Sequence, residues 1–223
     1  PMDHIISAPD MATIYDIPIR LEEEGLGEKL LKKMGFTARR EPDWTHWNEL
    51  LERSKRPTKT LSVAMVGKYV DIGDFQLTDS YISVNQSLLH AGVAADTKVE
   101  ITWIDGRSFE RGERDVESLA EFGGIIVPGA FGEGGAEGVI AALKFARETG
   151  MPFLGLCYGM QMAVVEYARH VAGIARATSE EISDDSDYQV VAVQESQKQV
   201  LQENRYGASM RLGAYAAVLK KDS

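Results

Sequence analysis

Cysteine is almost absent from this sequence, because Cys157 is the only one among its 223 residues. No disulfide can form within the chain, which is usual for proteins of the reducing cytoplasm. No apolar run approaches the roughly 20 residues that span a bilayer, and the first residues lack the pattern of a signal peptide. We therefore expect a cytoplasmic protein with no membrane contact.

Positive charge is also scarce, since 24 lysines and arginines face 34 aspartates and glutamates, for a formal net charge of −10. Such a surface repels a phosphate backbone, so nucleic acid is not an expected partner. Hydrophobic residues make up 44% of the chain, which is enough for a globular core.

The hydrophobic pattern changes near Pro57, inside a polar and basic stretch that is typical of a linker. Residues 1–57 predict short helices, the last capped by Asp43 and packed through Trp44 and Trp47. From residue 58 onward, apolar runs alternate with helical patterns, which predicts an α/β fold with a parallel sheet covered by helices on both faces. The expected strands are 61–66, 99–104, 124–127 and 152–156, then 188–193 and 211–219; the expected helices are 80–91, with Gly92 as its stop, 116–121, 137–148 and 159–171.

Cys157 lies between the last strong strand and its helix, in the string Gly155-Leu-Cys-Tyr-Gly159. Glycines two residues before and after a nucleophile are typical of a sharp strand-to-helix turn, where the backbone is strained and neighbouring side chains would collide. The helix N-terminus places a partial positive charge close to the sulfur. The pattern predicts a nucleophile; the alternative is a buried cysteine that acts as a small apolar residue.

A glycine-rich loop, residues 128–135, follows the strand 124–127. Its N–H groups could hold a phosphate or the oxyanion of an acyl intermediate. The Lys-Ser/Thr ending of a Walker loop is missing. Together with a cysteine on the following strand, the loop favours thiol acyl transfer.

These strings resemble the class I glutamine amidotransferases, and within them the CTP synthase family. Residues 153–171 are similar to the family's nucleophile strand and helix almost throughout, with further similar strings at 66–69, 79–84, 126–129, 138 and 209–215. Residues 7–10 and 14–24 resemble the end of its synthetase (amidoligase) domain. The resemblance thus implies two parts: residues 1–57, the end of the synthetase domain with linker helices, and residues 58–223, a C-terminally truncated amidotransferase domain.

The resemblance implies that Cys157 attacks the amide of L-glutamine and that the released ammonia serves the ATP-dependent amination of UTP to CTP, in pyrimidine nucleotide biosynthesis. No cofactor or metal is expected in this chain, because ATP and Mg²⁺ would bind the missing synthetase domain. That domain is the expected partner, in a homotetramer at full length. The implied residues for glutamine and its oxyanion are Gly129, Ala130, Phe131, Tyr158, Gly159, Met160, Gln161 and Glu181; backbone groups of Gly129 and Tyr158 would form the oxyanion hole.

The family also has a His-Pro-Glu string that supplies the catalytic base, and this chain has no such string. His170 lies thirteen residues along the same helix as Cys157, about 20 Å away at 1.5 Å per residue, so it cannot reach the sulfur. We therefore expect the chain alone to be inactive. The alternatives are a non-catalytic α/β binding or assembly module with the same fold, and a different cysteine hydrolase.

Two residues inside the resembling part differ from those usual in the family. Ala130 stands where the family usually has glycine, and its methyl group would strain the loop by about 1 kcal/mol or more if the backbone there has a positive φ. Gly134 stands where the family usually has arginine, near the site linked to GTP activation.

Overall fold

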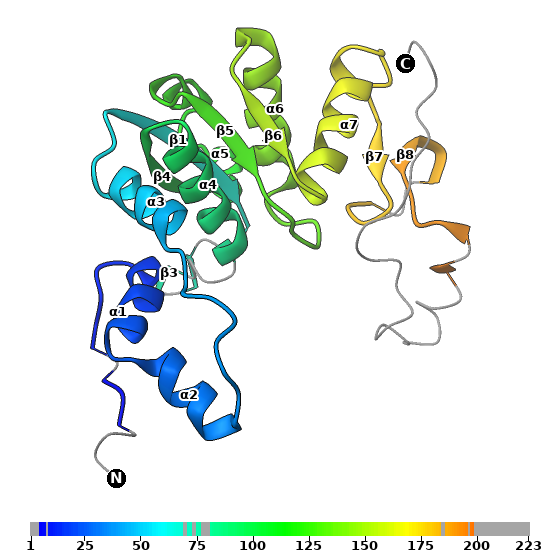
Figure 1. Cartoon of the computed structure of the whole chain (residues 1–223). Helices are drawn as coiled ribbons and strands as arrows, with labels where there is room; N and C mark the ends of the chain where they lie inside the picture. Colours follow the sequence, from blue (N-terminus) through cyan, green and yellow to red (C-terminus); the bar gives the residue numbers. More distant parts are fainter. Residues whose placement is uncertain are drawn as a thin grey trace, which may run out of the picture. The chain divides into compact units, whose positions relative to one another are not determined.

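The computed structural model describes residues 5–7, 9–68, 71–72, 75–76, 81–183, 186–195 and 197–198 (Figure 1). The chain forms two compact units, of which the first comprises Pro1–Ser62 and Tyr81–Glu100 and the second Val63–Ser80 and Ile101–Ser223. The boundaries of the two units follow from which residues pack together in the structure. The assignment of residues 1–57 to the end of a synthetase domain stays a prediction.

The elements follow one another as strands alternating with helices after a helical beginning. The helices are α1 (Ile17–Glu23), α2 (Leu26–Met34), α3 (Thr45–Lys55), α4 (Ile82–Ala94), α5 (Gly106–Glu110), α6 (Ala136–Thr149) and α7 (Tyr158–His170), with 3-10 turns η2 (Ile14–Asp16), η4 (Val116–Glu121) and η5 (Ser186–Tyr188). The strands are β1 (Lys59–Gly67), β2 (Asp71–Ile72), β3 (Phe75–Gln76), β4 (Thr97–Asp105), β5 (Gly124–Val127), β6 (Phe153–Gly155), β7 (Thr178–Ser179) and β8 (Gln189–Val191).

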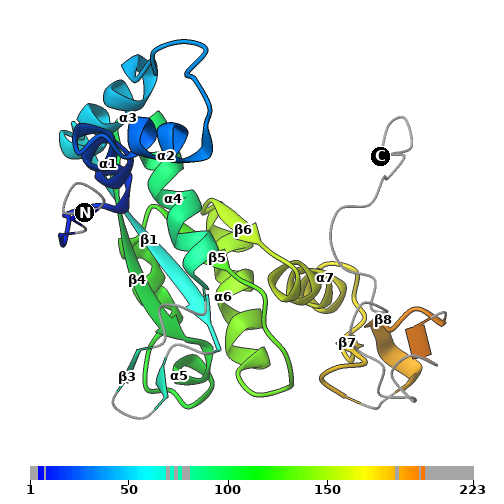
Figure 2. The ribbon, with the colours of Figure 1, turned by 60° about the horizontal axis from the view of Figure 1, so that its bottom comes forward.

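The main sheet has four strands in the order β4-β1-β5-β6. Strand β5 is parallel to β1, with Ile126 opposite Met65, and parallel to β6, with Ile126 opposite Leu154. Parallel neighbours need a helix to return the chain, and α6 returns it between β5 and β6 (Figure 2). The predicted α/β class is confirmed.

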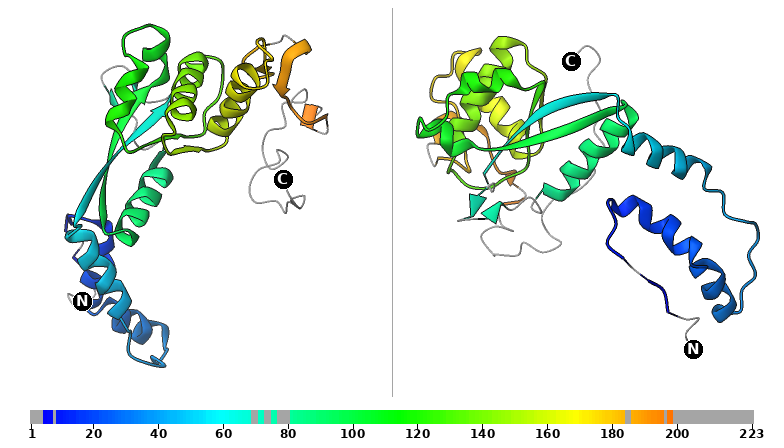
Figure 3. Two further views of the ribbon diagram at one scale, coloured as in Figure 1. Left: turned by 90° about the horizontal axis from the view of Figure 1, so that it is seen from above. Right: turned by 90° about the vertical axis from the view of Figure 1, so that its left-hand side faces the viewer.

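Helices α6 and α7 pack side by side in the second unit, and α5 packs against α6 (Figure 3). The α5–α6 approach is close because neither helix has a side chain at the crossing: a Cβ atom at Gly138 would lie 1.8 Å from the Gly106 carbonyl oxygen. Apolar residues of the strands and of α6 and α7 fill the core around this contact, among them Val66, Val139 and Val165. The carboxyl ends of β5 and β6 are thereby held by a rigid scaffold.

The first unit is held by hydrogen bonds between its helices. The Trp47 indole N–H donates to the Tyr15 carbonyl oxygen (2.9 Å), and the Tyr15 hydroxyl donates to Gln86 Oε1 (2.8 Å). The Asp43 carboxylate accepts from the Thr45 N–H (3.0 Å). The N-cap of α3 is Trp44, which makes no side-chain cap, so the cap predicted at Asp43 is shifted by one residue. Trp47 is therefore a packing residue, as the sequence predicts.

The predicted helix stop at Gly92 is wrong, because α4 continues to Ala94. A Cβ atom at Gly92 would lie 2.5 Å from the Thr97 carbonyl oxygen, so a glycine is needed here for two segments of the chain to come close.

Strand β7 was not predicted, since it is only two residues long. The predicted strand 211–219 and the similar string 209–215 lie outside the described residues, as do residues 79 and 80 of the string 79–84. Within the described ranges, no helix is both long and apolar enough to cross a membrane.

Candidate active site

Cys157 occupies the turn between β6 and α7 with φ 52° and ψ −105°. A positive φ costs a residue with a side chain about 1–3 kcal/mol, and such strain persists only where the surroundings impose it. Besides Cys157, only Asp96 among the described non-glycine residues has a positive φ. The strained backbone that the glycine spacing predicts is therefore present at the cysteine.

The two flanking glycines are required by close backbone contacts. A Cβ atom at Gly155 would lie 2.7 Å from the Gly159 carbonyl carbon, and one at Gly159 would lie 2.2 Å from the Val127 carbonyl oxygen. Real Cβ atoms do not approach other atoms this closely. The first turn of α7 can therefore sit directly against the end of β5 only because both positions lack a side chain.

The Cys157 thiol is free and exposed. The alternative of a buried apolar cysteine is therefore wrong. The thiol also lies next to the glycine-rich loop, because a Cβ atom built on Gly129 would be 3.6 Å from Cys157 Cβ. The topology thus brings together the two features that the sequence places on separate strands.

Ala130 shows no backbone strain, since it is not among the residues with a positive φ. Its methyl group is 5% exposed and packs within the core of the second unit. The strain expected for a positive φ at this position is therefore absent. The alanine fits because the loop turns only after it, at Gly132 with φ 79°.

Replacing Ala130 by glycine is consequently expected to destabilise the protein. The variant loses a buried methyl group, about 0.8 kcal/mol, and gains chain entropy when unfolded, about 0.4–1 kcal/mol, for a total of about 1–2 kcal/mol. Chemical denaturation would measure it, with Ala175→Gly at an exposed turn position as the control. An Ala130→Gly variant that is more stable than the unmodified chain would contradict this account.

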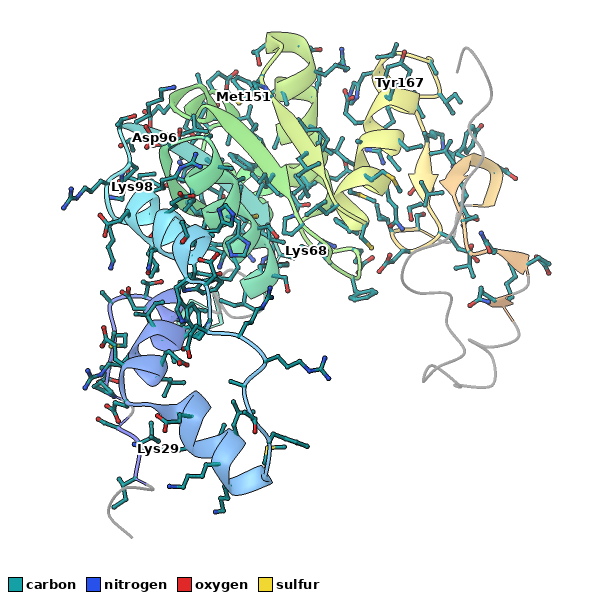
Figure 4. All side chains as sticks on the ribbon, viewed as in Figure 1. Lys29, Lys68, Asp96, Lys98, Met151 and Tyr167 are labelled. Atoms are coloured by element: carbon teal, nitrogen blue, oxygen red, sulfur yellow. The ribbon has the colours of Figure 1, made fainter. Side chains whose placement is uncertain are left out.

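Lys68 and Glu181 meet the same loop from two sides. The Lys68 ammonium group donates to the carbonyl oxygens of Phe131 (3.4 Å) and Gly132 and lies 4.2 Å from the centre of the Tyr158 ring. Lys68 is labelled in Figure 4. The Glu181 carboxylate accepts from the Gly132 N–H at 2.7 Å. Glu181, which the resemblance implies as a glutamine ligand, thus contacts the loop itself.

Lys68 is 7% exposed, and this burial lowers the pKa of its ammonium group, while the charges of Glu181, Glu110 and Glu133 act in the opposite direction. No role of Lys68 was predicted from the sequence, although this residue belongs to the similar string 66–69. A charged residue directly after a buried strand is the signal that could have singled it out.

The remaining implied residues flank the thiol on the loop and the helix. Phe131 is 75% exposed at the loop tip, and Met160 is 57% exposed in the first turn of α7. The Gln161 N–H donates to the Cys157 carbonyl oxygen (3.0 Å), and the Tyr158 ring is buried beneath Lys68. The exposed Phe131 and Met160 thus belong to the loop and the helix that meet at Cys157.

No described histidine is seen to serve Cys157 as a base. His170 ends α7, and its Nδ1 lies 3.2 Å from the carboxylate of Glu166, which is itself bound by Arg147 (2.9 Å). His46 has Glu49 as its partner, and His90 has Tyr15. The expectation that His170 does not act on the sulfur agrees with this arrangement.

Comparison of the chain with known proteins shows the family to which it is similar. The model of the family described as glutamine amidotransferase class-I matches residues 76–219. Over all 223 residues the chain is 45% identical to a CTP synthase of Methanococcoides burtonii and 42% identical to one of Thermococcus gammatolerans. The chain spans 40% of the length of each of these relatives.

Among solved structures, the chain is similar to the glutaminase domain of Trypanosoma brucei CTPS with bound acivicin. The TM-score is 0.56 and the sequences are 35% identical, over 62% of this chain and 52% of that one. The likeness therefore extends to both sequence and fold.

Proposed function

The chain belongs to the class I glutamine amidotransferase family, and on that premise we propose that residues 58–223 form a glutaminase domain with Cys157 as its nucleophile. The sulfur attacks the side-chain amide carbon of L-glutamine, and the carbon–nitrogen bond breaks. Ammonia leaves and a glutamyl thioester remains, which water cleaves to glutamate and free thiol. Backbone N–H groups of Gly129 and Tyr158 stabilise the oxyanion.

One observation carries the proposal: an exposed thiol on a strained strand-to-helix turn lies beside a glycine-rich loop. Strain of this kind is retained at functional sites, where it presents a nucleophile to substrate. A cysteine that only filled space would have neither the exposure nor the unusual backbone.

For the whole protein we propose the reaction of its relatives, the synthesis of CTP. Ammonia from Cys157 would pass to a synthetase domain that aminates UTP with ATP, and Mg²⁺ and ATP would bind there. Residues 1–57 would be the end of that domain, and a cytoplasmic homotetramer would be the full assembly. The identity of 37–45% to CTP synthases across nearly the whole chain supports this wider role.

The proposal predicts that a glutamine-derived chloroketone alkylates Cys157 selectively. The sulfur displaces chloride from the reagent's methylene carbon, and the glutamine part directs the reagent to the site. Mass spectrometry of the intact chain and of its peptides would show one adduct, on Cys157. Competition by L-glutamine is expected to slow the reaction, and competition by D-glutamine is not.

Two controls make the result decisive. A Cys157→Ser variant is expected to form no adduct. Iodoacetamide, which needs no glutamine site, reports the intrinsic reactivity of the thiol. A chloroketone that reacts no faster than it does with a free cysteine derivative, or that is not slowed by L-glutamine, would contradict the proposed function.

A further inference from the structure

Two side chains of opposite charge bind the two ends of the peptide unit between Phe131 and Gly132. Its carbonyl oxygen, on Phe131, accepts from the Lys68 ammonium group (3.4 Å), and its N–H, on Gly132, donates to the Glu181 carboxylate (2.7 Å). In a trans peptide the C=O and N–H bonds point in opposite directions. The cation and the anion therefore both stabilise the same orientation of the peptide dipole.

The glycine at position 132 allows this peptide to turn over. Rotating it exchanges the positions of the oxygen and the N–H and changes φ of Gly132, which is 79° in the structure. Glycine accepts positive and negative φ about equally, so the backbone itself imposes no choice. In the reversed orientation, the carbonyl oxygen would face the Glu181 carboxylate and the N–H would face the Lys68 ammonium group. The two charges thus decide the loop conformation that the glycine leaves open.

Several contacts fix the Lys68 side chain in this position. It follows β1 directly, is 7% exposed, also bonds the Gly132 carbonyl oxygen, and lies over the buried Tyr158 ring. Tyr158 immediately follows Cys157, so the same side chain contacts both the loop and the first residue of α7. Charge-assisted hydrogen bonds in a buried setting are roughly twice as strong as neutral ones.

We infer that Lys68 is a positioning residue of this site: together with Glu181 it locks the 131–132 peptide in one orientation, and so presets the loop beside Cys157 for a glutamine-like substrate. A preset loop spares the ordering that substrate binding would otherwise require. The inference rests on the proposed glutaminase function.

The test compares two alkylation rates of Cys157 in the full 223-residue chain, one with the glutamine-derived chloroketone and one with iodoacetamide. Their ratio measures recognition of the glutamine part and cancels the reactivity of the thiol. Lys68→Met keeps an unbranched apolar stem, one atom shorter, and removes the charge. The ratio is expected to fall about tenfold or more, the size of a lost charge-assisted hydrogen bond, while the iodoacetamide rate is unchanged.

Two further variants serve as controls for this result. Lys98→Met removes an exposed lysine that pairs only with the exposed Glu100 (2.7 Å) among the contacts described, and is expected to leave the ratio unchanged. Lys68→Arg keeps the charge and donors and is expected to retain most of the selectivity. A Lys68→Met ratio equal to that of the unmodified chain would overturn the inference.

A measurement on the unmodified chain keeps the inference testable should Lys68→Met fail to fold. The lock needs the protonated amine, and burial lowers the pKa of Lys68 against the opposing charges of Glu181, Glu110 and Glu133, while the Tyr158 ring also contacts the ammonium group. The ratio is therefore expected to fall as the pH rises through this lowered pKa. A ratio that stays constant up to the pKa of an ordinary lysine would overturn the inference.

Failure of the lock and failure of the proposed function give different results. If Cys157 of the unmodified chain shows no preference for the chloroketone, the glutaminase proposal itself is wrong. If that preference is present and does not depend on Lys68, only the lock is wrong.

Discussion

Replacing Gly159 by alanine is expected to lower the free energy of unfolding by about 3 kcal/mol, the upper end for overpacked sites. The new Cβ atom would lie 2.2 Å from the Val127 carbonyl oxygen and 2.8 Å from Val127 Cβ. Both atoms belong to the central strand β5, which is paired on each side and cannot retreat. Thermal unfolding followed by circular dichroism is expected to show a fall in Tm of roughly 6–12 °C.

The matched control is the same substitution at Gly134. No atom lies within 4 Å of a Cβ atom built there, and its φ is not in the left-handed region. Gly134→Ala is therefore expected to change the Tm little. Equal stability of the Gly159 and Gly134 variants would show that α7 does not pack against β5 as described.

Ammonia release from L-glutamine by the 223-residue chain is expected to be no faster than that by its Cys157→Ser variant. A positioned general base contributes about 10²–10⁴-fold to such reactions, and the described histidines all have other partners. The chain should nevertheless be alkylated at Cys157, because the chloroketone needs the site and the thiol but no proton transfer to a leaving amine. A coupled assay for ammonia would measure the turnover.

Turnover that depends on Cys157 would contradict this prediction and would show that another group acts as the base. The combination of glutamine binding, measured by calorimetry, with no ammonia release from the full-length protein would instead favour the non-catalytic binding module. The two measurements together therefore separate an enzyme that needs further residues from a protein that only binds glutamine.

Much of the fold was predictable because its causes are local. The strand 124–127 and the helix 137–148 follow from short apolar runs, a helical period and flanking glycines, and the structure places β5 at Gly124–Val127 and α6 at Ala136–Thr149. Gly92 misled the prediction because a glycine can serve a close contact as well as a helix end. That contact is with Thr97, and no local pattern distinguishes the two roles.

The sequence by itself determined the nucleophile turn, because the strain at Cys157 and the missing side chains at Gly155 and Gly159 are all contained in five consecutive residues. Only the tertiary structure decided what surrounds that turn. Lys68 meets Gly132 across 64 residues of chain, and Gly132 meets Glu181 across 49. Ala130 is unstrained because the loop bends at Gly132. Hydrogen bonds between distant segments depend on where the strands place them, so no spacing along the chain reveals them.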